Sequence, residues 1–421
     1  MRMTIVGTGY VGLVSAVGFA EQGHRVTCVD MDREKVDSVQ RGIPPFFEPG
    51  LEDALRQLRE SGKLDATTDI SDSAADSDII VLAVGTPASE RGMDLTALLG
   101  AARDIGKALA GSSRYHVVAV KSTVVPGTTE DRVVPIVREA SGLGPQSLGF
   151  CVNPEFLREG SALEDFRDPD RIVIGELDER SGDTVAALHK TFDCAVLRTS
   201  TRNAELIKCV NNALLATLVS FSNEVAAICE NVPGTDEETV LEGVRLDARL
   251  RCGARSSATS VGIAHYLSAG IGFGGSCLPK DIESLAAFAS QNDVRPSLLK
   301  AAIEINENRA KNLVDRLESR LSGLEGKRVA VLGLVFKPGT DDLRRSASVR
   351  LALECADRGA VTLAFDPMVP VAPPDWGGRI QLTQSVEAVL DGADAAILAT
   401  AWPEFGAIDW PTATRSMRTP L

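Results

Sequence analysis

One cysteine stands in a segment that is built mainly from glycine. Residues 272–281 read GFGGSCLPKD, and the helix-like stretch DIESLAAFASQ begins four residues after Cys277. The glycines offer the sulfur little side-chain packing, and a nearby helix N-terminus lowers the pKa of a thiol and favours the nucleophilic thiolate. Asp281 follows four residues later. The pattern favours a nucleophile at Cys277 over one more small core cysteine.

A second chemical pattern is the pair Lys208 and Asn212 in AELIKCVNNALL. The two residues lie one turn apart in an otherwise apolar helical run. A lysine on a buried face is unfavourable unless it is paired or used in chemistry. A lysine whose amine reaches solvent is the alternative, but the adjacent asparagines favour a polar site.

The stretch NPEFLREG (153–160) contains two carboxylates. Asn153 and Pro154 suit the N-cap and first position of a helix, and the i, i+4 spacing then puts Glu155 and Glu159 on one side of it. Acidic residues in a first helical turn are also ordinary capping. Both interpretations stay open at this point.

The N-terminus carries a nucleotide-binding pattern. Gly7, Gly9 and Gly12 spell G-x-G-x-x-G between a short apolar run and an amphipathic run, and Asp30 ends the next apolar run. Such glycines let backbone N–H groups approach a pyrophosphate at a helix N-terminus. An acid at the end of the second strand accepts the adenosine ribose hydroxyls and repels a 2′-phosphate, so NAD is predicted over NADP. Lys35, taken alone, is typical of a solvated helix charge.

Two further loops follow apolar strands, VGTP (84–87) and KSTVVPGT (121–128). Ligands bind at the carboxyl edge of a parallel sheet, where these loops are expected. Thr123 is the favoured candidate there, although glycine, proline and hydroxyl residues also serve plain turn chemistry.

The elements that position these residues alternate in type. Strands and helices alternate over residues 1–199, residues 200–322 read as helical, and residues 323–421 again hold strands, at 326–342, 360–369 and 394–400. Alternation of this kind indicates a parallel, doubly wound sheet. We therefore predict an α/β protein with two Rossmann-like domains joined by a long central helix and a helical middle domain.

Composition excludes several classes of protein. The chain has 421 residues, a net charge of −14 and 44% hydrophobic residues. Nucleic-acid binders need a basic face, which this balance disfavours. The sequence has no signal-type leader and no unbroken apolar run of membrane length, and its eight scattered cysteines and four histidines suit no metal site. Reduced thiols in a cytoplasmic enzyme are expected.

Seven motifs, in order, resemble the UDP-glucose/GDP-mannose dehydrogenase family: GTGYVG, VGTP, STVVPGT, NPEFLREG, ELIKCVNN, GFGGSCLPKD and FKPGTDDLRRS. They extend over nearly the whole chain. The resemblance implies an N-terminal NAD domain, a central helix that builds a homodimer, and a C-terminal nucleotide-sugar domain.

The resemblance also implies a reaction. A sugar C6 alcohol is oxidised twice with two NAD+, through a thiohemiacetal and a thioester on Cys277, to a uronic acid. The implied catalytic residues are Cys277, Lys208, Asn212, Glu159, Thr123 and Asp281. Lys208 and Asn212 stabilise the oxyanion, Glu159 is the general base with Thr123 holding the water, and Asp281 assists the water or Lys208.

The same resemblance assigns the binding residues. Those for NAD are Gly7, Gly9, Tyr10, Val11, Gly12, Asp30, Lys35, Val84, Gly85, Thr86, Pro87, Ser122, Thr123, Glu159 and Arg344. Those for the nucleotide sugar are Glu155, Phe156, Leu157, Lys208, Asn212, Ser268, Gly272, Phe273, Gly274, Cys277, Phe336 and Lys337.

Three positions depart from the family pattern. Val261 stands where an arginine commonly reaches the neighbouring subunit's substrate, and Arg249, Arg251 or Arg255 are candidates to replace it. Ala347 stands where proline is usual. The sequence ends at TRSMRTPL, before the DGRN strand that often supplies a substrate-binding arginine. We expect either that the terminus is truncated or that phosphate binding is weaker or rearranged.

UDP-glucose is the favoured substrate, and GDP-mannose is the alternative. Two other functions stay open, a single-step hydroxyacid dehydrogenase and a nucleotide-sugar-binding protein without turnover. The number of NADH formed per substrate separates the first from the favoured function, and uronic acid formation excludes the second.

Overall fold

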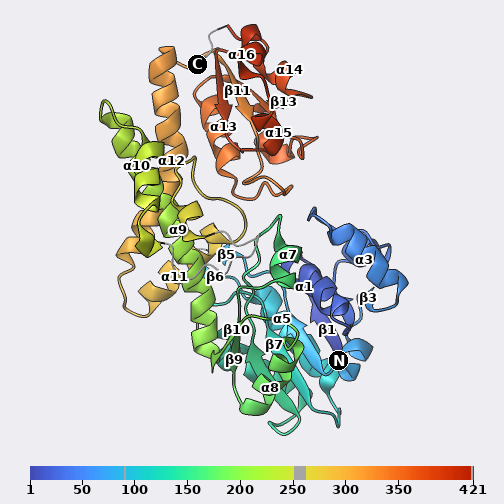
Figure 1. Ribbon diagram of the computed structural model, residues 1–421. Coiled ribbons are helices and arrows are strands. Elements are labelled where there is room, and N and C mark those ends of the chain that lie inside the picture. Colours follow the sequence, from blue (N-terminus) through green and yellow to red (C-terminus); the bar gives the residue numbers. More distant parts are fainter. Residues whose placement is uncertain (90–91, 251–261, 419–420) are drawn as a thin grey trace. The chain divides into compact units, whose positions relative to one another are not determined.

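The computed structural model describes residues 1–89, 92–250, 262–418 and 421 (Figure 1). A first compact unit comprises Met1–Asn211 together with Ala287–Asp293, and a second comprises the other described residues. Helix α9 (Thr201–Asn231) begins in the first unit and ends in the second.

The first unit is built on an eight-stranded sheet of order β10-β9-β8-β7-β4-β1-β2-β3. The pairings are parallel except for that between β8 and β9, which is antiparallel. The strands are β1 (Arg2–Val6), β2 (Arg25–Val29), β3 (Leu64–Thr67), β4 (Ile79–Leu82), β7 (His116–Val120), β8 (Leu148–Val152), β9 (Arg171–Glu176) and β10 (Ala195–Ser200). β5 (Ala88–Ser89) and β6 (Gly92–Met93) form a separate antiparallel pair.

Both faces of this sheet are covered by helices. Alternate residues of a strand point to opposite faces, and in β4 Ile79 and Val81 join one buried cluster while Ile80 and Leu82 join another. The helices of this unit are α1 (Tyr10–Glu21), α2 (Arg33–Gln40), α3 (Leu51–Glu60), α4 (Ser71–Asp76), α5 (Thr96–Leu109), α6 (Val134–Ser141), α7 (Ala162–Arg167) and α8 (Glu179–Leu188), with a π-helical turn at Thr129–Val133. This confirms the expected doubly wound α/β architecture.

The strand order reverses between β1 and β4. From β1 the chain proceeds outward through β2 and β3, and then returns to β4 on the other side of β1. Open α/β sheets bind their ligands beyond the carboxyl ends of the strands at such a reversal. The loop after β1 contains the glycine motif, and the loop after β4 contains VGTP. These two predicted ligand-binding segments therefore lie at the point where the strand order reverses.

The second unit contains a smaller parallel sheet of order β13-β12-β11-β14. Its strands are β11 (Arg328–Leu332), β12 (Val361–Phe365), β13 (Ile380–Leu382) and β14 (Ala395–Leu398). Helices α13 (Ala347–Asp357), α14 (Val386–Leu390), α15 (Pro403–Gly406) and α16 (Trp410–Ala413) belong to the same region (Figure 1). Ala347 is the first residue of α13 after the N-cap Ser346. Proline is favoured there but not required, which explains why alanine is tolerated.

The predicted helical middle region is present. It contains most of α9, α10 (Glu237–Arg245), α11 (Leu278–Gln291) and α12 (Ser297–Leu321), with 3-10 turns at Ala248–Leu250 and Ile263–Tyr266. Ala310 and Val314 of α12 belong to the same buried cluster as the small sheet. Of the positions discussed for a subunit contact, Arg251, Arg255 and Val261 lie outside the described residues, and Arg249 forms an ion pair with Asp247 at 2.5 Å.

By length and composition alone, α9 qualifies as a candidate membrane span among the described residues, although 44% of the relevant window is buried inside the protein. The helix also buries Glu205, Lys208 and Asn212. Core helices pass the same test, and these buried polar residues fit that interpretation.

One local prediction is wrong. Residues 153–158 are not helical, and the next helix, α7, begins only at Ala162. Asn153 is therefore no helix cap. Its side-chain amide donates to the carbonyl of Val173 at 2.9 Å, so a partner on β9 holds the segment in an irregular path.

Candidate active site

The glycine turn after β1 has the geometry that a dinucleotide needs. Gly7 has a φ of +102°, a left-handed conformation that favours glycine. A Cβ built on Gly12 would lie 1.9 Å from the carbonyl oxygen of Gly7, whereas one on Gly9 meets no described atom within 4 Å. Tyr10 begins α1, and its N-cap Gly9 provides no side-chain cap. The first N–H groups of α1 therefore remain available to a phosphate.

Asp30 directly follows β2, which ends at Val29, and is held by the glycine turn itself. One carboxylate oxygen accepts from Thr8 N at 2.8 Å and from Thr8 Oγ1 at 2.7 Å, and the other accepts from Asp32 N at 3.0 Å. Burial works to raise the pKa of Asp30, but these donors and the charge of Lys35 outweigh it and lower the pKa. Asp30 therefore stays ionised. Lys35 forms an ion pair with Asp32 at 3.7 Å.

Tyr10 has a structural partner that the sequence did not indicate. Its hydroxyl donates to the buried Glu48, and Gly160 N donates to that hydroxyl at 2.8 Å and to Glu48 at 2.7 Å. Burial, followed by the Glu48 hydrogen bond and charge, raises the pKa of Tyr10. Glu48 also accepts from Ala162 N at 2.6 Å, the first residue of α7. This network holds the turn that contains Glu159 against α1, where Val11 is half-buried.

The loops after β4 and β7 are tied to each other. Ser122 Oγ donates to the carbonyl of Val84 at 2.7 Å, and Thr86 Oγ1 donates to the carbonyl of Thr123 at 2.7 Å. These bonds fix the VGTP loop, including Gly85 and Pro87, against Ser122 and Thr123. Two predicted groups of cofactor residues are thus brought together.

The loop after β7 has a second support on α9. The buried carboxylate of Glu205 accepts from Gly127 N at 2.6 Å and from Thr129 N at 2.8 Å. Burial raises the pKa of Glu205 despite these donors. Glu205 was not among the predicted residues, because its partners Gly127 and Thr129 lie more than 70 positions earlier in the sequence.

Lys208 forms a buried ion pair with Glu155. Lys208 Nζ lies 2.8 Å from Glu155 Oε1, and the side chains are 4% and 5% exposed. Leu157 N donates to the other oxygen of Glu155 at 2.6 Å. Burial alone would raise the pKa of Glu155, but Lys208 and the backbone donor reverse this and lower it. The Lys208 ammonium also lies 5.5 Å from the ring centroid of Phe156.

A second buried lysine lies in the same unit. Lys121 Nζ donates to Asn153 Oδ1 at 3.1 Å and to the Asn153 carbonyl at 3.3 Å. His189 Nε2 lies 3.3 Å from the same Oδ1. Burial lowers the pKa of Lys121 to about 8, with Glu155 opposing and Lys208 adding to the shift. Lys121 is the first residue of the KSTVVPGT motif, but it was assigned no role from the sequence. Its burial beside Asn153 and His189 depends on residues distant in the sequence, so the motif alone could not predict it.

Glu159 is buried in the turn that precedes α7, 8% exposed. The preceding residue, Arg158, forms an ion pair with Asp165 of α7 at 2.5 Å. The backbone of the turn is thus anchored on both sides of Glu159, by this pair and by the Glu48 network.

In the second unit, Cys277 lies directly before α11, as predicted. Its carbonyl accepts from Asp281 N at 2.9 Å in the first helical turn. The sulfur lies 3.5 Å from Ser276 Oγ, and the residue is half-buried rather than enclosed. The α11 N-terminus supplies the positive end of a helix dipole, which favours a thiolate at this position.

Asp281 links two other polar side chains. Asn212 Nδ2 donates to Asp281 Oδ2 at 2.6 Å, and Lys280 Nζ donates to Asp281 Oδ1 at 2.6 Å. Asp281 is 1% exposed. Asp281 thus contacts Asn212 and Lys280, and its assistance to the water or to Lys208 stays a prediction.

The segment before Cys277 packs closely on the loop after β11. A Cβ on Gly275 would lie 2.9 Å from the Phe336 ring, and one on Gly274 would lie 2.6 Å from the Arg345 carbonyl. Gly275 N donates to the carbonyl of Arg344 at 3.0 Å. This contact brings the predicted substrate residues Gly274, Phe336 and Cys277 into one neighbourhood of the second unit.

Three remaining candidates form contacts within the same unit. The Lys337 ammonium lies 5.7 Å from the Phe336 ring centroid. The Arg344 guanidinium donates to both carboxylate oxygens of Asp342 at 2.8 Å. Ser268 Oγ accepts from Arg245 at 3.3 Å. Arg344 was expected to serve NAD, and that role stays a prediction.

The doubly wound sheet with its glycine turn and the acid after β2, together with a cysteine at a helix start, fits one class: an NAD-dependent oxidoreductase. Three family models match in succession, and they describe the NAD binding domain (residues 1–193), the central domain (202–308) and the UDP binding domain (330–421) of one family. The chain belongs to the UDP-glucose/GDP-mannose dehydrogenase family. A nucleotide sugar is accordingly its substrate class.

Relatives are similar over their whole length. The chain is 40% identical to the UDP-glucose 6-dehydrogenase YwqF of Bacillus subtilis, over 100% of this chain and 92% of the relative. It is 41% identical to the UDP-glucose 6-dehydrogenase AglM of Haloferax volcanii, over 97% and 93%. A GDP-mannose 6-dehydrogenase of Pseudomonas putida is 36% identical, over 97% and 93%. The solved UDP-glucose dehydrogenase of Pyrobaculum islandicum aligns with a TM-score of 0.90 at 39% identity, over 99% of this chain and 96% of that one.

Proposed function

We propose that this enzyme oxidises the C6 alcohol of UDP-glucose to the carboxylate of UDP-glucuronate, with two NAD+ consumed per sugar. The observation that carries the proposal is Cys277 at the start of α11, one helical turn before the Asn212–Asp281 hydrogen bond. The high identity to UDP-glucose 6-dehydrogenases supports UDP-glucose as the sugar.

The cofactor residues fit NAD. The free N–H groups at the start of α1 suit a pyrophosphate, and the ionised Asp30 suits a ribose diol. We assign the loops that Ser122 and Thr86 tie together to the nicotinamide half. NAD+, when bound, accepts a hydride from C6 in each of the two oxidations.

Cys277 supplies the covalent chemistry. After the first oxidation the sugar C6 is an aldehyde, and the Cys277 thiol adds to it: an S–C bond forms and the carbonyl oxygen takes the thiol proton. The second oxidation converts this thiohemiacetal to a thioester with loss of a hydride and a proton. Water then breaks the S–C bond, which releases the carboxylate and restores the thiol. Covalent capture keeps the reactive aldehyde on the enzyme and divides one difficult step into easier ones.

The remaining site residues stabilise charge and move protons. We assign Lys208 and Asn212 to the oxyanion, where loss of one donor typically costs ~10²–10³ in rate. Glu159 acts as the base that activates the hydrolytic water, with Thr123 holding that water. Glu155 keeps Lys208 oriented through the 2.8 Å ion pair.

The nucleotide sugar is assigned to the second unit's loops and to the turn after β8. The residues are Phe156, Leu157, Ser268, Gly272, Phe273, Gly274, Phe336 and Lys337. Lys337 provides a local cation for the diphosphate on an acidic chain. The proposed domains are the NAD-binding domain (residues 1–199), the central helical domain (200–322) and the nucleotide-sugar-binding domain (323–421).

A homodimer through α9 is supported by a stripe of apolar side chains that are exposed in the described structure. Five large apolar residues of α9 are between 38% and 58% exposed: Leu206, Val210, Leu214, Phe221 and Ile228. At 100° per residue their directions fall within an arc of ~80° on one side of the helix. Thr217 and the exposed Glu224 lie in the same arc, so the stripe is mainly apolar. A mainly apolar stripe along one side of a long helix suits a second copy of α9. We further propose a cytoplasmic location, where its thiols stay reduced.

The decisive experiment counts NADH and identifies product. Purified enzyme should form two NADH per UDP-glucose, and UDP-glucuronate by mass spectrometry. One NADH per sugar with an aldehyde product would refute the proposal. GDP-mannose and UDP-N-acetylglucosamine belong in the same steady-state panel, because a higher kcat/KM for GDP-mannose would establish the alternative that the Pseudomonas relative represents.

A further inference from the structure

The segment 270–275, which leads to Cys277 and which we name the ledge, has little rigidity of its own. Four of its six residues are glycines: Gly270, Gly272, Gly274 and Gly275. Glycine loses more conformational freedom on ordering than any other residue. A surface that must hold a sugar beside a sulfur therefore depends on anchors from elsewhere in the chain.

Two asparagines provide part of that anchorage. Asn306 of α12 accepts from Phe273 N at 2.7 Å and donates to the Phe273 carbonyl at 3.1 Å. Asn223 of α9 accepts from Gly270 N at 2.8 Å. Both side chains are buried, at 5% and 1% exposure. The ledge is thus held by hydrogen bonds to its backbone from α9 and α12. A ligand could therefore bind on the side of the ledge that faces away from these helices.

The third anchor is a buried arginine. Arg309 of α12 donates through Nε to the Gly270 carbonyl at 2.8 Å. Its two terminal nitrogens donate to Glu230 of α9, at 3.0 and 3.3 Å. The side chains of Arg309 and Glu230 are 6% and 10% exposed. A guanidinium offers several donors in a fixed plane, so the pairing with Glu230 also determines the direction of Nε.

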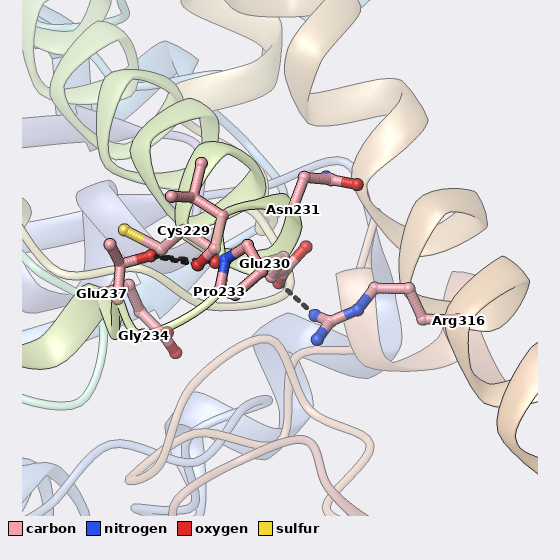
Figure 2. A pocket seen from close by; sticks show the side chains of 9 residues that line it. Cys229, Glu230, Asn231, Pro233, Gly234, Glu237 and Arg316 are labelled. Carbon is pink, nitrogen blue, oxygen red and sulfur yellow. Dashed lines mark hydrogen bonds and ion pairs between the residues drawn. The ribbon is translucent and has the colours of Figure 1, made fainter.

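Glu230 has a second arginine partner, Arg316, which extends from α12 like Arg309. Arg316 Nη1 lies 2.6 Å from Glu230 Oε1. Figure 2 shows Arg316 directed toward Glu230 at a pocket lined also by Cys229, Asn231 and Pro233. Arg309 and Arg316 therefore share one carboxylate, and within the described structure Arg309 is the one of the two that donates to the backbone of the ledge.

We propose that Arg309 is a positioning residue for the nucleotide sugar, and that Glu230 fixes its guanidinium. Arg309 acts through the Gly270 carbonyl, on the side of the ledge toward α12. This inference rests on the proposed function, because it assigns the ledge to the sugar. Its effect belongs to sugar binding and to the approach of C6 to Cys277, and not to NAD.

The test compares Arg309→Gln with Arg316→Gln. For Arg309→Gln we expect the KM for UDP-glucose to rise about tenfold, with the KM for NAD+ within twofold of wild type. For Arg316→Gln, which removes a charge from the same carboxylate, both KM values should stay within twofold. Arg309→Lys keeps one donor and should recover part of the loss. Equal KM values for UDP-glucose in the two glutamine variants would overturn the proposal.

A second variant covers the case in which Arg309→Gln does not fold. Glu230→Gln keeps the shape and one acceptor, and should raise the KM for UDP-glucose severalfold, with an altered rate of Cys277 alkylation by iodoacetamide. A Glu230→Gln protein with wild-type KM and alkylation rate would refute the role of the pair. Failure of the proposed function is a different result, since wild-type enzyme would then form no uronic acid at all.

Discussion

Asn212 Nδ2 and Asp281 Oδ2 lie 2.6 Å apart, and both residues are buried. Asn212 stands in the fourth turn of α9 and Asp281 in the first turn of α11, so this hydrogen bond joins two helices that are far apart in sequence. The carboxylate fixes which end of the amide faces it, because it can only accept. The orientation of Asn212, and thus its use as a donor, depends on Asp281.

We expect Asp281→Asn to lower kcat about tenfold. An asparagine at 281 lets the Asn212 amide turn over, and the loss should be smaller than the ~10²–10³ typical for complete removal of an oxyanion donor. Steady-state kinetics with UDP-glucose measure it. Lys280→Gln, which removes the other partner of Asp281, should cost less. An unchanged kcat in Asp281→Asn would exclude the positioning role.

Glu159→Gln should stop the reaction at the thioester. Without a base to activate water, an acyl adduct accumulates on Cys277 after two NADH have formed. Intact-mass spectrometry of enzyme mixed with UDP-glucose and NAD+ detects it. Cys277→Ala should form no adduct and no acid, and Glu164→Gln, an exposed glutamate on α7, should turn over normally. Normal turnover of Glu159→Gln would show that the base lies elsewhere.

Lys121 should make stability depend on pH. Burial lowers its pKa from 10.5 to about 8 in the folded protein. Between these values the unfolded chain binds more protons than the folded one, so the free energy of unfolding rises with pH. Relative to Lys121→Met, wild type should therefore gain stability from pH 7 to pH 10.5, on the order of 3 kcal/mol.

Urea unfolding at several pH values measures this difference for Lys121. Lys63→Met, at an exposed lysine, controls for loss of a lysine as such. A constant difference between wild type and Lys121→Met across this range would mean that Lys121 is not desolvated as the structure indicates.

Asp30→Asn should weaken NAD+ binding and reduce the preference for NAD+ over NADP+. The substitution removes the charge that repels a 2′-phosphate. An amide also has only one acceptor oxygen, so it cannot accept hydrogen bonds from both Thr8 and Asp32 as the carboxylate does. We expect the KM for NAD+ to rise about tenfold, with a smaller change for NADP+. Asp32→Asn, a neighbouring acid that caps α2, is the matched control. Retained selectivity in Asp30→Asn would contradict the assignment.

The sequence predicted best what is local. The glycine turn, the acid at the end of β2 and the cysteine before α11 each depend on residues within a few positions, where backbone geometry and residue type are directly linked. The doubly wound architecture followed from the alternation of apolar runs, because each strand is buried on both faces.

The partners of the polar residues could not be predicted. Lys208 was expected in a polar site, but its ion pair with Glu155 joins positions 53 residues apart. The helix expected at Asn153 is absent, because Asn153 is bonded instead to Val173 and Lys121. Tertiary hydrogen bonds of this kind override local capping preferences, and a single sequence contains no record of them.

The ledge also limits what can be transplanted. Its glycine-rich sequence resembles a short motif that could be moved by itself, but its backbone is held by Asn223, Asn306 and Arg309. A graft of residues 270–281 onto another scaffold would carry Cys277, the proposed nucleophile, without the helices that hold the loop in shape. The structural unit consists of the loop and one face each of α9 and α12. A designer who wishes to transfer this site to another protein must transfer all three parts.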